Sequence, residues 1–446
     1  MEEVKKEKGR AINRLRSMHP LRAKIDKSYL SSIEAAREGR GAVWSMVNWY
    51  QADPIFKAMG LESVSPENYG ALTAASGVAE KYLDAADQEG FPTHLCGYAR
   101  VNFGYASKMV HDPGDKPPMG GLPKPVLLLS SGHICDARVK WFQALGEYLD
   151  APVWMMDTPT PGVEEFGAEG AFEAAVEFIM NELREFIGFL EKLLGKKMDW
   201  DRYAEVVNDM IALCRIAHMT FDMRKAEPCP MHSRDFWSVM PSYLLLLGDL
   251  KESIALFQDL FDEVKQRVES GIGAVAPEKF RLAFAEIPPW HSLGFFDRLA
   301  ERGWNFVVES WGYMPPLPIP EIEQISDPLR RHAVFHLNFL TSRYQVARAD
   351  KEYFGYMGYP YLAMVRDYRC DGVVLHPILT CRSTSLHHPY LRNLLAEKAD
   401  VPSLLLEGDI VDLRLFNPEE AMRKAEAFEE VMLHHREIRA SKRRES

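Results

Sequence analysis

The chain has 446 residues, of which 47% are hydrophobic and 26% are charged, and its formal net charge is −11. This composition is typical of a globular protein with about three domains. The negative charge disfavours nucleic acid as a partner, and the apolar runs are too short to span a membrane. The first residues are charged and contain no apolar signal region, so we expect a cytoplasmic protein.

The first part of the chain alternates between predicted strands and helices. Residues 1–40 are charged and helix-prone, which predicts a helical arm that packs on the body or on a partner subunit. A first α/β domain is predicted over residues 41–166. Its expected strands are 41–48, 125–130 and 152–156, and its expected helices are 53–59, 69–90, 98–110 and one that ends at Leu149.

The hydrophobic period changes after the first domain. Between Phe172 and Leu190 apolar residues recur every three or four positions, which predicts a long amphipathic helix. Similar patterns over 200–223 and 233–268 predict more helix. We therefore expect a helical segment over residues 167–275.

A second α/β domain with a C-terminal helix is predicted over residues 276–446. Its expected strands are 281–287, 305–310, 372–378 and 402–407, and its expected helices are 292–303, 328–349, 352–369, 386–398 and 418–439. Alternating strands and helices favour right-handed crossovers and parallel sheets. The predicted fold class is α/β, with two parallel-sheet domains of the Rossmann or flavodoxin type, a helical segment between them and an N-terminal helical arm.

Three of the six cysteines occupy similar places in the pattern. Cys96, Cys135 and Cys381 each follow an apolar, strand-like run and precede a helix-like one. Ligands of parallel α/β sheets gather at this edge of the sheet, and the positive end of the following helix favours a thiolate. The remaining cysteines lack this setting; they are Cys214, Cys229 and Cys370.

Three thiolates from distant parts of the chain predict a metal or iron–sulfur site in the cleft between the two halves. A four-iron cluster on three cysteines keeps one iron without a protein thiolate. The competing interpretation is three buried, inert cysteines. An arginine lies within one helical turn of each cysteine, where its charge would offset that of an anionic cluster. These arginines are Arg100, Arg138 and Arg382.

Several histidines flank the cysteines and are candidates for proton transfer near neutral pH. They are His94, His133, His376, His387 and His388. Surface or supporting roles are the competing interpretation. The chain has no Gly-x-x-x-x-Gly-Lys loop and no Gly-x-Gly-x-x-Gly turn, so a partner must supply any ATP chemistry.

Several short motifs occur together in a fixed order between residues 40 and 435. They are Cys96-Gly-Tyr-Ala-Arg100, the strand before Cys135, Asp371-Gly-Val-Val followed by Cys381, and Leu405-Leu-Glu-Gly-Asp409 with Arg423 and Glu426-Ala-Phe428 downstream. Together they resemble the 2-hydroxyacyl-CoA dehydratase D-component family, which includes the B and C subunits of ATP-dependent benzoyl-CoA reductase. The family often has serine where this chain has Gly97.

The resemblance implies specific roles for these residues. Cys96, Cys135 and Cys381 match the ligands of a [4Fe-4S] cluster. It also implies a heterodimer with a homologous second subunit, an ATP-hydrolysing activator with its own iron–sulfur cluster, and an aryl-CoA or acyl-CoA substrate. His376 is our expected proton donor.

The Cys96 motif and the charged arm are most similar to the B subunit of the reductase. We therefore predict an oxidoreductase, the iron–sulfur subunit of an ATP-dependent aryl-CoA reductase that carries out radical reduction of an aromatic acyl-CoA. Two alternatives stay open. One is a 2-hydroxyacyl-CoA dehydratase subunit, which eliminates water by radical chemistry, and the other is a non-catalytic subunit that relays electrons.

Overall fold

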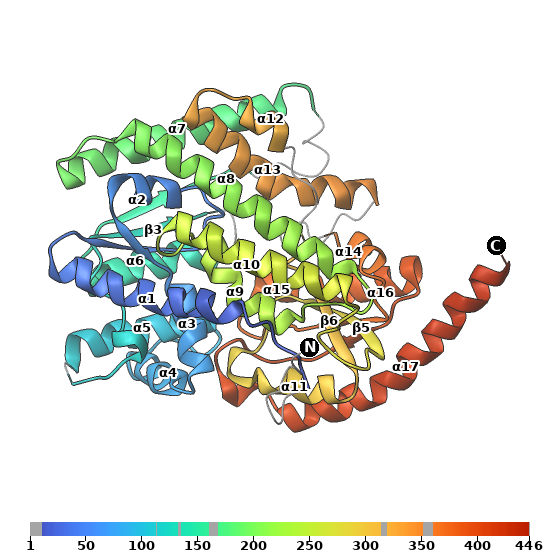
Figure 1. Cartoon of the computed structure of the whole chain (residues 1–446). Helices are drawn as coiled ribbons and strands as arrows, with labels where there is room; N and C mark the ends of the chain where they lie inside the picture. Colours follow the sequence, from blue (N-terminus) through green and yellow to red (C-terminus); the bar gives the residue numbers. More distant parts are fainter. Residues whose placement is uncertain are drawn as a thin grey trace.

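The computed structural model describes residues 11–112, 114–132, 135–159, 168–313, 319–350 and 360–445. Within these residues the chain forms two four-stranded parallel sheets surrounded by helices (Figure 1). The predicted α/β fold class is confirmed. None of the described helices combines the length and apolar character needed to cross a membrane.

The first sheet has the strand order β2-β1-β3-β4. Its strands are β1 (Ala42–Ser45), β2 (Glu62–Val64), β3 (Leu127–Ser131) and β4 (Val153–Met156). The helices of this part are α2 (Asp53–Met59), α3 (Pro66–Ala75), α4 (Ala79–Gln88), α5 (Gly97–His111) and α6 (Ala137–Leu149). The central strands β1 and β3 are buried along their whole length, and both are apolar up to the serines at their carboxyl ends.

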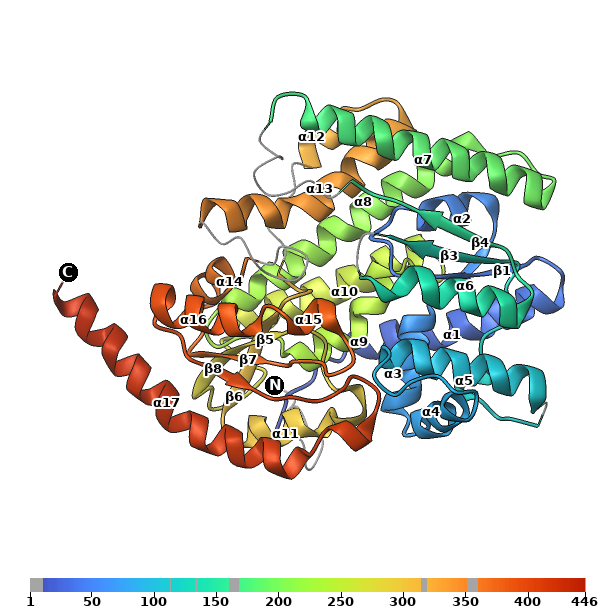
Figure 2. The same ribbon diagram turned by 180° about the vertical axis from the view of Figure 1, so that it is seen from behind.

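The second sheet has the order β6-β5-β7-β8, so it repeats the 2-1-3-4 arrangement of the first. Its strands are β5 (Phe280–Ala285), β6 (Trp304–Glu309), β7 (Gly372–Leu375) and β8 (Ser403–Leu405). The helices of this part are α11 (Gly294–Glu301), α12 (Ile319–Glu323), α13 (Pro328–Ala349), α14 (Tyr361–Asp367), α15 (Arg382–Ser385), α16 (His388–Ala399) and α17 (Pro418–Glu445). The last helix, α17, runs past α11 and projects from the body (Figure 2).

The described residues between the two sheets are helical, as expected. The helices are α7 (Ala171–Leu194), α8 (Trp200–Asp222), α9 (Ser233–Leu244) and α10 (Leu250–Glu269). Helix α8 packs against α2, α10 and α13, so this segment joins both halves. The N-terminal helix α1 (Met18–Arg37) packs on α9 of the same chain. The domain boundaries at residues 40, 166 and 275 stay predictions.

Three local expectations are wrong. The strand β2 is absent from the predicted elements, and the helix expected over 69–90 is two helices, because Gly77 takes a left-handed conformation with φ of 71° and ends α3. The run before Cys96 is a turn after α4 and not a strand. The beginning of the helix expected over 352–369 lies outside the described residues.

Candidate functional site

A cavity of about 90 Å³ lies where the two sheets and the helical segment meet, and all three predicted cysteines line it. Cys96, Cys135 and Cys381 are half-buried, whereas Cys214 and the remaining two cysteines are fully buried away from the cavity. The structure therefore brings together three residues that lie far apart in the sequence.

The sheet topology explains why the cavity forms here. In a parallel sheet of order 2-1-3-4, the chain leaves strands 1 and 3 in opposite directions, and a crevice opens at their carboxyl ends. Cys135 lies between β3 and α6, and Cys381 follows β7 and directly precedes α15. Cys96 reaches the same place differently, from the turn that caps α5. The crevices of both sheets thus face one cavity.

Hydrogen bonds join the loops that carry Cys96 and Cys381. The backbone N–H of Gly97 donates to the Thr380 hydroxyl at 3.2 Å, and Thr380 donates to the Asp409 carboxylate. A side chain at position 97 would place its Cβ 2.6 Å from the Asp409 carboxylate, so in this chain glycine allows the close approach without a shift of Asp409. This contact fixes the two cysteine loops relative to each other across the interface between the halves.

The thiols are close enough to influence one another electrostatically. Burial is the largest effect on the pKa of all three thiols and raises each of them. For Cys381 the pKa rises to about 11. The negative charges of Cys381 and Cys135 raise the pKa of Cys96 further, whereas the Arg138 guanidinium opposes burial at Cys135. Three thiolates in this cavity therefore require a cation among them.

The spacing of the sulfur atoms distinguishes a single ion from a cluster. In the part of the chain that the structure describes, one group of three metal-binding side chains has its ligand atoms all within 4.8 Å of one another. That group is Glu286, His387 and His388, and it contains no cysteine. The three cysteine sulfurs are therefore spread more widely. Zn–S bonds of about 2.3 Å in a tetrahedral site place sulfurs only about 3.8 Å apart. This wider spacing does not match a single tetrahedral ion held by the three cysteines.

The three predicted arginines have different surroundings. Arg138 lines the cavity and donates to the Val47 carbonyl at 2.6 Å and to the Glu67 carboxylate at 2.7 Å. Arg100 is buried outside the cavity lining and forms ion pairs with carboxylates of α4 and of the loop after β8. Arg382 is 78% exposed and pairs with Asp136. Only Arg138 of the three lies at the cavity.

Most of the remaining cavity wall is apolar. It includes Trp237, Met240 and Leu244 of α9, and Trp290 and Trp311 of the second half. Apolar walls with a few polar groups are typical of sites that bind small organic ligands. The cavity can therefore enclose an apolar acyl group beside the three thiols.

The predicted proton donor, His376, does not line the cavity. It is buried, its Nδ1 donates to the Ile287 carbonyl at 2.6 Å, and burial lowers its pKa to about 4. Its role as proton donor stays a prediction. His94 is exposed, and His133 lies outside the described residues.

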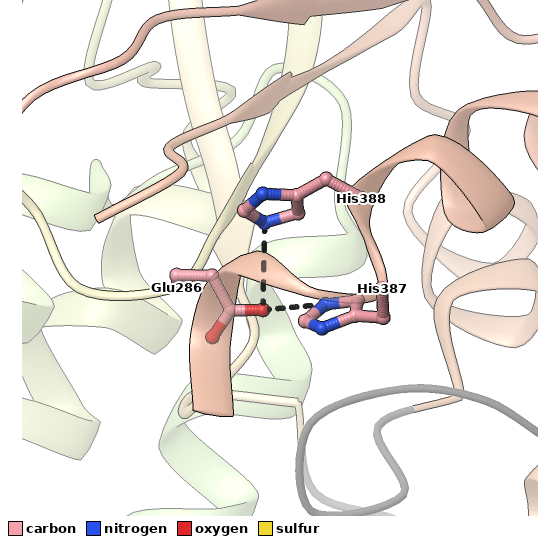
Figure 3. Close-up of side chains that lie close together, drawn as sticks. All are labelled: Glu286, His387 and His388. Carbon is pink, nitrogen blue, oxygen red and sulfur yellow. Dashed lines mark ion pairs between the residues drawn. The ribbon is translucent and has the colours of Figure 1, made fainter. Parts of the chain in front are cut away.

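Glu286 lines the cavity and is a site residue that the sequence patterns alone did not single out. It directly follows β5, and the same sheet-edge argument that selects Cys135 and Cys381 would have found it. His387 and His388 approach it from the start of α16, as Figure 3 shows.

Comparison with known proteins identifies the family. The family model described as 2-hydroxyglutaryl-CoA dehydratase, D-component, matches residues 48–432. The chain belongs to this family. It is 25% identical to the alpha subunit of (R)-2-hydroxyisocaproyl-CoA dehydratase from Clostridioides difficile, over 92% of this chain and 94% of the relative. It is 24% identical to the alpha subunit of lactoyl-CoA dehydratase from Anaerotignum propionicum, over 90% and 92% of the two chains.

A reductase component also matches, over a shorter region. The chain is 23% identical to the B subunit of benzoyl-CoA reductase from Thauera aromatica, over 77% of this chain and 78% of the relative. The predicted family is confirmed. The dehydratase alternative is better supported than the predicted reductase function, because the dehydratase relatives cover more of both chains.

Proposed function

We propose that this chain is a subunit of a 2-hydroxyacyl-CoA dehydratase, which removes water from a 2-hydroxyacyl-CoA to give a 2-enoyl-CoA. The observation that carries the proposal is the apolar cavity lined by Cys96, Cys135 and Cys381. It occurs in a chain whose dehydratase relatives align over at least 90% of both sequences.

The three cysteines would hold a [4Fe-4S] cluster. When bound, such a cluster supplies one-electron chemistry and an iron that carries no protein thiolate. Arg138 places its charge at the cavity wall, where it offsets the negative charge of the thiolates. The tryptophans of the wall pack against the acyl group and exclude water, which protects reactive species from side reactions.

The proposal includes partners. A homologous second subunit completes a heterodimer, and an ATP-hydrolysing activator with its own iron–sulfur cluster delivers low-potential electrons. The sequence contains no phosphate-binding loop of the Gly-x-x-x-x-Gly-Lys type, which supports a separate ATP-dependent protein.

An aryl-CoA reductase subunit is the second candidate, favoured by the match to the B subunit of benzoyl-CoA reductase. The number of electrons separates the two functions. A dehydratase returns its electron at the end of each turnover and needs ATP only to start, whereas a reductase consumes two electrons for each product.

The test is an assay of the complex of this chain, its partner and the activator, purified without oxygen. We expect 2-enoyl-CoA to form from a 2-hydroxyacyl-CoA through many turnovers per electron supplied. If the complex instead reduces an aromatic acyl-CoA with two electrons consumed per product, and does not dehydrate a 2-hydroxyacyl-CoA, the chain is a reductase subunit and the proposal is wrong. Cys381→Ala should abolish product formation, whereas the control Cys214→Ala should not, because Cys214 is buried away from the cavity.

A further inference from the structure

Glu286 is a carboxylate in an otherwise largely apolar part of the cavity. It is 1% exposed, directly follows β5 and has a φ of 77°, a conformation that non-glycine residues rarely adopt. Such a strained backbone conformation persists only where the surrounding structure holds it. The backbone N–H of Glu286 donates to Ser310 at 3.1 Å, which helps to hold this conformation.

The two carboxylate oxygens of Glu286 have different surroundings. Oε1 accepts a hydrogen bond from the Tyr361 hydroxyl at 2.7 Å and lies 3.0 Å from Nε2 of His387 and 4.0 Å from Nε2 of His388. Oε2 is buried and accepts no hydrogen bond within the described part of the chain. Figure 3 shows Oε2 pointing away from both imidazole rings. One oxygen is therefore anchored and the other is available to accept a proton.

A buried carboxylate oxygen without a partner loses its hydration and gains nothing in return, so it is rare in folded proteins. A ligand in the cavity can supply the missing partner, because Glu286 itself lines the cavity with the cysteines. His376 lacks this position, since it faces Gly408 and donates to the Ile287 carbonyl.

We propose that Glu286 is the group that removes the C3 proton of the acyl chain, with Tyr361 as the positioning residue for its anchored oxygen. This inference rests on the proposed dehydratase function and adds a catalytic residue to it. The site would accept a short or medium 2-hydroxyacyl thioester whose C3 lies beside Oε2.

The net reaction balances in atoms and electrons. The C3–H bond breaks, the proton goes to Oε2 of Glu286, and the electron pair of that bond becomes the C2=C3 π bond. The C2–O bond breaks with its electron pair, and the hydroxide that leaves takes the proton from Glu286 to form water. The activator supplies one low-potential electron, which the thioester returns at the end of the turnover, so no electron is consumed.

The experiment compares variants in the complete complex with partner and activator. Glu286→Gln keeps the shape of the side chain and removes the base, so we expect kcat to fall about 10²–10⁴-fold while KM and the iron content stay unchanged. Formate added to Glu286→Ala should restore part of the lost activity, because it supplies a carboxylate in the vacated space. Glu407→Gln is the matched control, since Glu407 is exposed in the loop after β8 and does not line the cavity.

Each outcome is decisive for one of the two proposals. If the wild-type complex forms no 2-enoyl-CoA, the proposed function fails. If the wild-type complex does form 2-enoyl-CoA but Glu286→Gln retains the wild-type kcat, the role of Glu286 is refuted. The same holds if Glu286→Gln retains kcat while His376→Gln loses it. Stoichiometric zinc or another non-iron divalent ion in the wild type, lost in Glu286→Gln, would likewise refute it and assign the group with His387 and His388 to a metal. If Glu286→Gln does not fold, absence of formate rescue in folded Glu286→Ala refutes the role.

Discussion

Two buried histidines of α13 should make the protein sensitive to mild acid. His332 donates from Nε2 to the Tyr50 carbonyl at 2.6 Å and accepts from the Tyr203 hydroxyl at Nδ1, also at 2.6 Å. One helical turn later, His336 donates to the Trp49 carbonyl at 2.8 Å. Trp49 and Tyr50 both have positive φ, so the two histidines hold a strained segment after β1.

Burial lowers the pKa of His332 to about 4 and that of His336 to about 3. An unfolded histidine has a pKa of about 6.5, so between pH 6.5 and 4 the unfolded chain binds protons that the folded chain does not. The free energy of unfolding therefore falls as the pH drops through this range. Because both folded pKa values lie below 5, each histidine contributes a loss of about 2 kcal/mol between pH 7 and pH 5.

The assay is urea unfolding at pH 7 and pH 5 of wild type and of His332→Gln. Glutamine keeps an N–H donor for the Tyr50 carbonyl but does not titrate. We expect the loss of unfolding free energy between the two pH values to be about 2 kcal/mol smaller in this variant than in wild type. His94→Gln, at an exposed position, is the control and should behave as wild type. An equal loss in His332→Gln and wild type would refute the reasoning.

Two further predictions concern the interior. Arg224 and Glu309 form a buried bidentate ion pair with N–O distances of 2.7 and 2.8 Å. Glu309→Gln should therefore lower the free energy of unfolding, measured with urea, by about 3–5 kcal/mol. A loss below about 1 kcal/mol would contradict this expectation. A Cβ at Gly104 would collide with the Tyr82 carbonyl of α4, so Gly104→Ala should lower the melting temperature. Gly188→Ala, in open space on α7, should raise it instead; equal effects of the two substitutions would refute the packing argument.

The regular elements with long apolar patterns could be predicted from the sequence. The expected helices over 53–59 and 328–349 have the bounds found for α2 and α13, because capping residues and prolines mark their ends. The strand β2 could not be predicted, since its three residues Glu62–Val64 are too few to show a period and two of them are half-buried. The apolar residues Phe91 and Leu95 favour a strand before Cys96, yet the residues between them form a turn.

The candidate site could be predicted in part. Cysteines at equivalent sheet edges could be found from local context, because the edge of a parallel sheet is set by strand order and crossover handedness. Arg100 and Arg382 lie next to cysteines in the sequence, but their side chains reach carboxylates outside the cavity lining. Glu286 directly follows β5, so the same sheet-edge argument selects its position, whereas its hydrogen bond with Tyr361 of α14 depends on the folded chain.

The central claim is that the three cavity cysteines bind an iron–sulfur cluster. Its most direct test is the iron and acid-labile sulfide content of protein purified without oxygen, in wild type and in Cys96→Ala, Cys135→Ala, Cys381→Ala and Cys214→Ala. We predict about four iron and four sulfide per chain in wild type and in Cys214→Ala, and loss of both in each of the other three variants. Wild-type protein without iron, or iron that is unaffected by these three substitutions, would contradict the account.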